Sequence, residues 1–137
     1  MISSVHHIGC LVENIEDATL TYTNLFPGGI VSKTFEIEEQ RVYVKFVQVA
    51  NLHIELVQPI DEQSTLFRIL KKNPGFYHIG IFTGNMDAEI ERLVQLGYRK
   101  LNKFKSAAFE NRHCAFLYTP EMHLIELIEE ALTPELA

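Results

Sequence analysis

An internal repeat constrains this chain of 137 residues more than any other feature of its sequence. The motif HisIleGly at 7–9 recurs at 78–80, and the motif IleGluLeu at 54–56 recurs at 125–127. Both recurrences lie 71 positions apart (78 − 7 and 126 − 55), so the histidine precedes its glutamate by 48 residues in both halves (55 − 7 and 126 − 78). This shared register indicates a duplicated structural unit with no net insertion between its two motifs.

The two halves share a predicted order of elements, which is one strand, one helix and three strands. Apolar runs at 5–12 and 76–83 have the length of strands. A helix is predicted after each run, because Asn14 and Asn85 can cap a first turn and apolar residues follow them at helical spacing. The predicted helix faces are Ile15, Ala18, Tyr22, Leu25 and Phe26, then Met86, Ile90, Leu93, Val94 and Gly97. The strands that follow are predicted at 30–37, 41–49 and 52–58, then at 99–106, 112–119 and 122–129.

These elements predict an α+β fold in a single domain over residues 1–137. Two tandem βαβββ modules occupy residues 5–58 and 76–130, and the linker at 59–75 contains a short helix that begins at Ser64. Residues 131–137 are predicted to form a loose tail. A chain of this length can bury one sizeable core, whereas two independent domains would each be marginal.

Charge and composition exclude several classes of function. The net charge is −6 and the pI is near 5.5, whereas binding to nucleic acid requires a basic face. No apolar run reaches the length of about 18 residues that a membrane-spanning helix needs, and the N-terminus lacks the basic segment of a secretion signal. Cys10 and Cys114 lie in apolar stretches, which is typical of buried free thiols in a reducing compartment. We therefore predict a cytoplasmic protein that binds neither nucleic acid nor membranes.

The repeated glutamates indicate a metal site. Glu55 and Glu126 each lie in the middle of an apolar strand, where burying a carboxylate is costly without a cation or several donors. His7 and His78 occupy the other pair of equivalent positions, so two imidazoles and two carboxylates can share one divalent ion. This ligand set favours Ni, Co or Zn and also admits Mn or Fe(II). An octahedral ion with four protein ligands keeps two positions for water or a chelating substrate.

Each of these residues alone has a simpler interpretation. A strand histidine is more often a hydrogen-bonded core or edge residue than a ligand, and a lone strand glutamate can face solvent. The match of residue type and register at four positions favours the metal site. His6 and Tyr77, just before the two histidines, are predicted to point to the opposite faces of their strands and are given no role.

Three motifs carry a resemblance to a known family. HisHisIleGly at 6–9, TyrHisIleGly at 77–80 and LeuIleGluLeuIleGlu at 124–129 resemble the vicinal oxygen chelate (glyoxalase/bleomycin resistance/dioxygenase) superfamily, and the resemblance spans residues 5–130. Within it, the pattern is most similar to methylmalonyl-CoA epimerase and short bacterial glyoxalase I enzymes. The resemblance implies a cupped, partly open mixed β-sheet barrel. It also implies metal-ligand roles for the matching His7, Glu55, His78 and Glu126.

The resemblance further implies a metal-dependent isomerase or lyase that moves a proton next to a thioester or hemithioacetal carbon. The substrate would be an acyl-thiol adduct of glutathione or CoA. The candidates for a basic rim around it are Lys103, Lys105, Arg112, Arg41 and Lys45, although dispersed charges of this kind are more often ordinary solvated surface residues. Glu126 is the preferred catalytic base and Glu55 is the symmetric candidate. Val44 stands where some epimerases carry an additional acidic residue, which weakens the match to the epimerases. The segment 106–118 looks more like the short glyoxalase I (lactoylglutathione lyase-like) enzymes, so both reactions stay open.

Two other functions remain as alternatives. A metabolite- or antibiotic-binding (resistance) protein of the same fold usually lacks the metal ligands, and this chain retains all four. An Fe(II) dioxygenase uses two histidines and one carboxylate, so the second carboxylate disfavours that reaction. Exposed sheet edges also leave a homodimer open.

Overall fold

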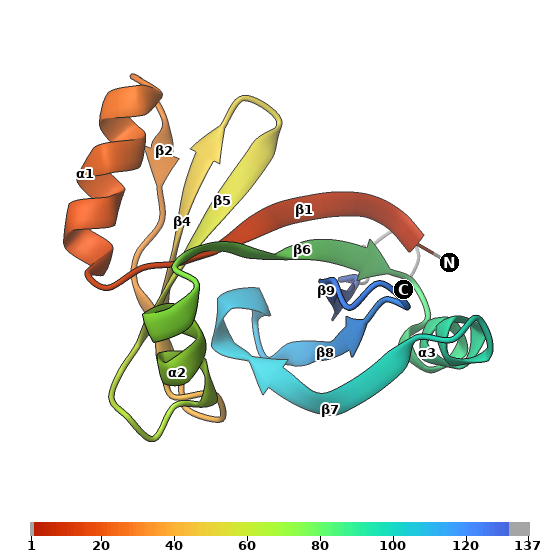
Figure 1. Cartoon of the computed structure of the whole chain (residues 1–137). Helices are drawn as coiled ribbons and strands as arrows, with labels where there is room; N and C mark the ends of the chain where they lie inside the picture. The colour runs from red at the N-terminus through yellow and green to blue at the C-terminus, as the bar shows by residue number, and fades with distance from the viewer. Residues whose placement is uncertain (1, 132–137) are drawn as a thin grey trace.

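The computed structural model describes residues 2–131 as one mixed β-sheet with helices packed on it (Figure 1). The elements in chain order are β1 (Ile2–Leu11), α1 (Ile15–Leu25), β2 (Ile30–Val31), β3 (Phe35–Ile37), β4 (Val42–Val49), β5 (Leu52–Pro59), α2 (Thr65–Lys72), β6 (Gly75–Thr83), α3 (Met86–Gln95), β7 (Arg99–Ser106), the short 3-10 helix η1 (Ala107–Phe109), β8 (Arg112–Tyr118) and β9 (Leu124–Glu129). Of the predicted tail, residues 132–137 lie outside the described part of the chain.

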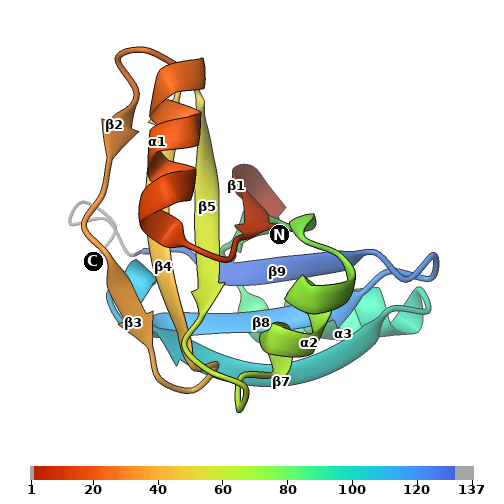
Figure 2. The ribbon, with the colours of Figure 1, turned by 60° about the vertical axis from the view of Figure 1, so that its left-hand side comes forward.

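The sheet is built from two similar halves that meet at its centre. The strand order is β2-β4-β5-β1-β6-β9-β8-β7, and β3 also pairs with β4. The central strands β1 and β6 are antiparallel to each other, and each has a parallel neighbour, β5 and β9 respectively. In Figure 2, β4 and β5 stand upright whereas β8 and β9 lie across the view, so the sheet bends into a cup. This arrangement confirms the predicted α+β fold with an open mixed sheet.

The two faces of the sheet hold different clusters of apolar residues. On the outer face of the sheet, helix α1 covers the first half through Ile15, and α3 covers the second half through Met86, Ile90 and Leu93. The concave face carries a third cluster that is rich in phenylalanine and draws on both halves. Its buried members are Leu11, Ile37, Val42, Val44, Phe46, Val57, Leu66, Leu70, Phe104, Phe109, Cys114, Phe116 and Ile128. The interior of the cup is therefore apolar, and any charged group inside it needs a partner.

The helix starts lie where the sequence predicts them. The side chain of Asn14 accepts a hydrogen bond from the Asp17 amide at 2.9 Å, and that of Asn85 accepts one from the Ala88 amide at 3.1 Å. Ser64 caps α2 in the same way. These caps satisfy amide groups that have no partner within the helix. Both cysteines are buried and free, as predicted.

The predicted strand at 30–37 is wrong in part, because the structure divides it into β2 and β3. Ser32 lies between them, and its hydroxyl accepts the hydrogen bond of the Phe46 amide at 2.9 Å. The Ser32 hydroxyl is thus the acceptor for an amide of β4 that would bond to a backbone carbonyl in a continuous ladder. The last strand begins at Leu124 rather than 122, since Met122 has a φ of 69° in the preceding turn.

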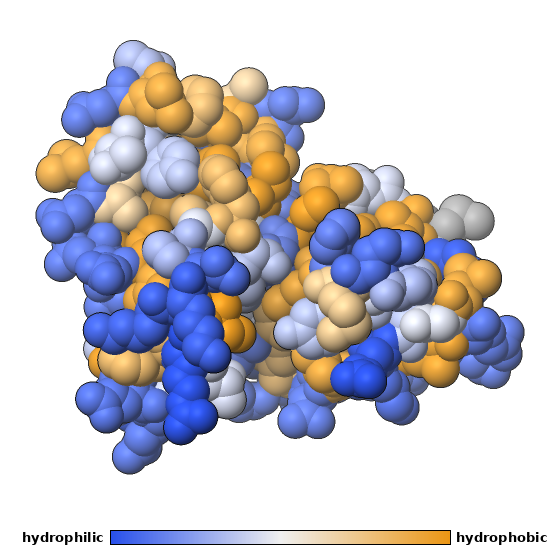
Figure 3. Space-filling view, viewed as in Figure 1, coloured by the Kyte–Doolittle hydropathy of each residue, from blue (hydrophilic) through white to orange (hydrophobic). Residues whose placement is uncertain are grey.

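The end of α1 differs from the predicted helix face. Leu25 is 62% exposed and Phe26 is 39% exposed, because the cluster beneath this helix reaches only as far as Tyr22. Figure 3 shows apolar surface over this end of the molecule. On α3, Val94 is also exposed at 43%. No helix within residues 2–131 is long and apolar enough to cross a membrane.

The pairing of β1 with β6 contains three irregularities, one between Ile2 and Ser4 and two that are equivalent to each other. Val5 lies opposite Ile81 and His7 opposite Gly80, which leaves His6 without an opposite residue. Gly9 lies opposite His78 and Cys10 opposite Phe76, which leaves Tyr77 without one. Such β-bulges interrupt the alternation of side chains between faces. Because His6 and Tyr77 are 71 positions apart, the bulges follow the internal repeat.

Candidate metal site

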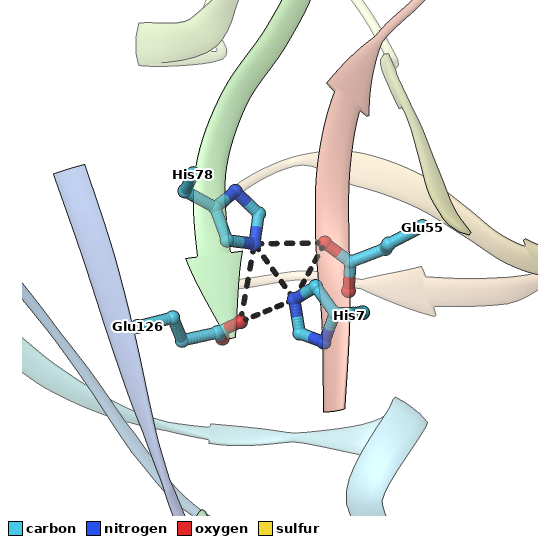
Figure 4. Close-up of side chains that lie close together, drawn as sticks. All are labelled: His7, Glu55, His78 and Glu126. Atoms are coloured by element: carbon cyan, nitrogen blue, oxygen red, sulfur yellow. Dashed lines mark hydrogen bonds and ion pairs between the residues drawn. The ribbon is translucent and has the colours of Figure 1, made fainter. Parts of the chain in front are cut away.

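Four buried side chains from four adjacent strands converge on the concave face of the sheet. His7 lies on β1, Glu55 on β5, His78 on β6 and Glu126 on β9, and Figure 4 shows their polar ends pointing toward one another. None of the four is more than 5% exposed. The structure thus brings together all four residues that the sequence analysis selected.

The glycines of the two repeated motifs make room for this convergence. A Cβ atom on Gly9 would lie 2.1 Å from the imidazole of His78, and one on Gly80 would lie 2.1 Å from that of His7. These separations are far below van der Waals contact, so each module contributes a glycine against which the histidine of the other module packs. Each HisIleGly motif therefore supplies one histidine of the cluster and the glycine that leaves space for the histidine of the other motif.

The spacing of the donor atoms fits one metal ion. The two histidine Nε2 atoms are 2.8 Å apart, and the distances from them to the nearest glutamate oxygens range from 3.1 to 3.5 Å. One donor atom from each residue lies within 4.8 Å of all the others. Donors about 2.1 Å from a common ion lie about 3.0 Å apart at octahedral angles and about 3.4 Å apart at tetrahedral angles. The arrangement therefore suits a divalent cation of the transition series.

Two buried atoms of the cluster make no hydrogen bond to any residue in the described part of the chain. They are Oε1 of Glu126 and Nδ1 of His78. A buried carboxylate oxygen without a donor is strongly unfavourable, and a cation would satisfy it. The cluster therefore has the chemistry of a cation site as well as its geometry.

The electrostatics of the cluster agree with this interpretation. Burial lowers the pKa of His78, but the carboxylates of Glu126 and Glu55, 3.3 and 3.2 Å from its Nε2, outweigh burial and raise the pKa from 6.5 to about 9. Burial raises the pKa of Glu126, but the close approach of its carboxylate to His7 and His78, at 3.1 and 3.3 Å, outweighs burial and lowers the pKa to about 2. The two carboxylates thus favour a positive charge between them.

His6 is part of the site, and the prediction that it points away is wrong. The bulge in β1 turns its ring inward, so that its Nδ1 lies 2.9 Å from Nδ1 of His7. The ring is stacked on His53 with centroids 4.3 Å apart, and it contacts the rings of Phe46, Phe82 and Phe109. Burial, with the charges of His7 and His53, lowers the pKa of His6 to about 3, so the ring is neutral.

Tyr77 also contacts the site, so the corresponding prediction is wrong for the same reason. Its ring meets that of His78 edge to face, with centroids 4.4 Å apart. Burial, and then the charges of Glu55 and Glu126, raise the pKa of Tyr77 well above its usual value. Its phenol is therefore protonated and can donate a hydrogen bond. Neither bulge can be recognised from the sequence, since one inserted residue leaves the apolar pattern of both strands intact.

Two adjoining cavities lie on the side of the site that faces α2. The first, of about 870 Å³, lies between β6, the end of α2 and the turn before β9, and His78 forms part of its wall. The second, of about 660 Å³, lies between α2, β7 and β8, and both Arg41 and Lys103 line it. Tyr77 and Tyr118 line both cavities. A further groove between α3 and β7 contains none of the four converging residues.

The opposite side of the site is covered by aromatic rings. Phe109 of η1 is 4% exposed and lies face to face with the His7 ring, with centroids 6.0 Å apart. Phe46 packs against both rings. The cavities beside Tyr77 therefore offer a small molecule the better approach to the four donors.

Fold and site together define a protein of paired βαβββ modules with a histidine–carboxylate cluster in their shared cup. The chain belongs to the glyoxalase/bleomycin resistance protein/dioxygenase superfamily, whose family model matches residues 6–118. The resemblance that the three sequence motifs carry is thereby confirmed.

The similar proteins include one without an assigned activity as well as epimerases. The chain is 27% identical to the uncharacterized protein YqjC of Bacillus subtilis over 93% of each chain. It is 32% identical to an ethylmalonyl-CoA/methylmalonyl-CoA epimerase of Cereibacter sphaeroides over 74% of this chain and 76% of that protein. The crystal structure of methylmalonyl-CoA epimerase from Mycobacterium tuberculosis superposes with a TM-score of 0.83 at 25% identity, covering 99% of this chain and 93% of that one.

Proposed function

We propose that this protein is a metal-dependent isomerase that moves a proton on the carbon next to a thioester carbonyl, in the manner of a methylmalonyl-CoA epimerase. The observation that carries the proposal is the convergence of two histidines and two glutamates, all buried, within 4.8 Å of one another beside a cavity. The names of the relatives support an acyl-CoA as the class of substrate.

The four converging residues would hold the ion, and their donors suit Ni, Co or Zn. A divalent ion bound there supplies Lewis acidity next to the substrate carbonyl. The apolar cup around the donors excludes water, which strengthens every charge interaction inside it. The chain itself therefore contributes the donors, their geometry and a dry environment.

Glu126 is the proposed base. Its buried carboxylate is ionised, because its pKa is lowered to about 2, and an ionised carboxylate in this cluster can take a proton from a substrate carbon. Glu55 is the equivalent residue of the other module and is the alternative base. Position 44 supplies no second carboxylate, because its residue is a valine that is buried in the concave cluster. The protonated phenol of Tyr77, which lines both cavities, can donate a hydrogen bond to a bound substrate.

Two cationic side chains are placed to meet a charged substrate. Arg41 and Lys103 line the cavity on the α2 side, and each forms an ion pair with an aspartate, Asp61 and Asp87 respectively. These pairs are exposed, so a phosphate group can compete for the cations. This placement supports a CoA-linked substrate, whose phosphates need cationic partners.

The proposal is tested by proton exchange. Protein loaded with Ni, Co or Zn is incubated with methylmalonyl-CoA in D₂O, and loss of the C2 proton signal is followed by NMR. We expect exchange with the loaded protein, and loss of exchange after chelation and in Glu126→Gln. Glu129→Gln is the matched control, because Glu129 is on the same strand but its side chain is 44% exposed.

A second candidate is the glyoxalase I-like lyase, which the apolar residue at position 44 favours. The same protein is therefore offered the hemithioacetal of methylglyoxal and glutathione. Formation of a thioester from this adduct, with no exchange in methylmalonyl-CoA, would replace the isomerase by the lyase. Exchange in neither substrate would contradict both reactions and favour a metabolite-binding protein.

A further inference from the structure

The two candidate ligand histidines are equivalent in sequence but differ in their surroundings. Nδ1 of His7 lies 2.9 Å from Nδ1 of His6. Nδ1 of His78 has no hydrogen-bond partner among residues 2–131, and the equivalent neighbour, Tyr77, contacts its ring only edge to face. The two modules therefore place equivalent Nε2 atoms in the cluster but differ in the hydrogen bonding of the Nδ1 atoms.

The bulge in β1 holds His6 firmly in this position. Its ring is stacked at 20° on His53, the residue of β5 that pairs with His7. Phe46, Phe82 and Phe109 also pack against it, with ring centroids 5.1 to 5.4 Å away. A ring packed in this way cannot turn without moving several core residues. Its Nδ1 is thus presented to His7 in one orientation.

The hydrogen bond determines where each ring carries its proton. Nε2 of His7 faces His78, Glu55 and Glu126, so this is the atom whose lone pair an ion would use. The proton of a neutral His7 must then be on Nδ1, which donates to Nδ1 of His6. His6 accepts with Nδ1 and carries its own proton on Nε2.

We propose that His6 is a positioning residue that fixes the tautomer and ring orientation of His7, and that module 1 thereby anchors the metal ion more firmly than module 2. This inference rests on the metal site of the proposed function. Loss of such an outer partner typically lowers metal affinity about 10- to 100-fold. His78 has no such partner within residues 2–131 and forms part of the wall of the first cavity, so it is the ligand that lies next to an entering substrate.

The first test measures zinc binding to the chelator-treated chain by calorimetry, with a competing chelator of known affinity. His6→Phe keeps an aromatic ring for the contacts with His53 and the phenylalanines but removes the acceptor, and its Kd should rise about 10- to 100-fold. His6→Asn restores an acceptor and should recover part of this loss. Tyr77→Phe, at the equivalent position of the other module, should change the Kd less than about threefold.

The outcomes separate this inference from the proposed function. If the wild-type chain binds no zinc, the metal site itself is refuted. If it binds zinc and His6→Phe binds equally well, or if Tyr77→Phe weakens binding as much, only the role of His6 is refuted. The thermal midpoints of the metal-free variants show whether a change in Kd reflects lost folding.

A second measurement needs no variant. In the zinc-loaded wild-type chain labelled with nitrogen-15, His7 should show a protonated Nδ1 and a metal-bound Nε2. A scalar coupling between the Nδ1 atoms of His6 and His7 should be visible across their hydrogen bond. A His7 Nδ1 proton that exchanges rapidly with water, with no such coupling, would overturn the proposal even if His6→Phe fails to fold.

Discussion

At the scale of single residues, the candidate site depends on two positions that carry no side chain. Gly9 and Gly80 are opposite His78 and His7 in the β1–β6 pairing, and a methyl group at either would overlap an imidazole. Neither glycine has a positive φ, so the backbone would accept another residue and the constraint is purely one of space. The sequence shows these glycines, but only the cross-strand register explains them.

Gly9→Ala is therefore expected to displace the His78 ring and weaken zinc binding at least about 10-fold, with a loss of about 1–3 kcal/mol in the free energy of unfolding from overpacking. Calorimetry and urea unfolding measure the two effects. Gly84→Ala is the control, because the nearest atom to its Cβ would be 3.7 Å away. Equal zinc affinity in both variants would show that the cup tolerates the methyl group.

The shifted pKa values predict how stability of the metal-free chain depends on pH. The pKa of His78 is raised from 6.5 to about 9, so its stabilising contribution is complete below pH 6.5 and is lost as pH rises through 9. The pKa of Glu126 is lowered from 4.5 to about 2, so its contribution is complete above pH 4.5 and is lost as pH falls through 2. Urea unfolding should therefore give the highest stability between about pH 4.5 and 6.5.

Zinc should remove the alkaline part of this profile, because the ion replaces the imidazole proton between the carboxylates. Metal-free Glu126→Gln should also lose less stability between pH 6.5 and 9, since the pKa of His78 is raised less when the negative charge of Glu126 is removed. A variant profile that coincides with the wild type would show that the two side chains do not interact when folded.

At the scale of elements, most of the secondary structure follows from local signals. The caps at Asn14 and Asn85, and the strands at 99–106 and 112–118, lie where the sequence predicts them. The main errors in the strands occur where a side chain or an inserted residue interrupts a ladder, at Ser32 and in the β1–β6 bulges at His6 and Tyr77. Period-two alternation is a property of regular strands, so it cannot reveal an interruption that leaves the apolar pattern unchanged.

The two helix caps should contribute independently. Asn14→Ala and Asn85→Ala each remove one hydrogen bond to a first-turn amide and should each lower the free energy of unfolding by about 1 kcal/mol. Asn102→Ala, at an exposed position of β7, is the control and should change it by less than about 0.5 kcal/mol. Urea unfolding gives all three values. Because the caps lie in different modules, the double variant should lose the sum of the two effects.

At the scale of the whole molecule, two connections close the cup. The β1–β6 pair joins the modules at the centre of the sheet, and η1 of module 2 packs against β3 of module 1. Through this second connection Phe109 covers His7, a residue of the other module. The site is therefore enclosed by contacts between segments about a hundred positions apart in the chain.

Phe109→Ala should accordingly lower the free energy of unfolding by about 3–5 kcal/mol, as expected for a buried phenylalanine. It should also let solvent reach His7 and so speed exchange of its ring proton. Phe76→Ala is the control, because Phe76 is 66% exposed and its loss should change stability by less than about 0.5 kcal/mol. A similar loss in both variants would show that η1 does not hold the modules together.

By itself the sequence determined the internal repeat and the four candidate donor residues, because a repeat offset of 71 and an apolar pattern can be read without knowing which strands are neighbours. Only the tertiary structure decided that His6 supports His7, that Tyr77 faces the cavities and that Phe109 encloses the site. Those contacts depend on a bulged register and on packing between distant segments, which no local pattern of residues specifies.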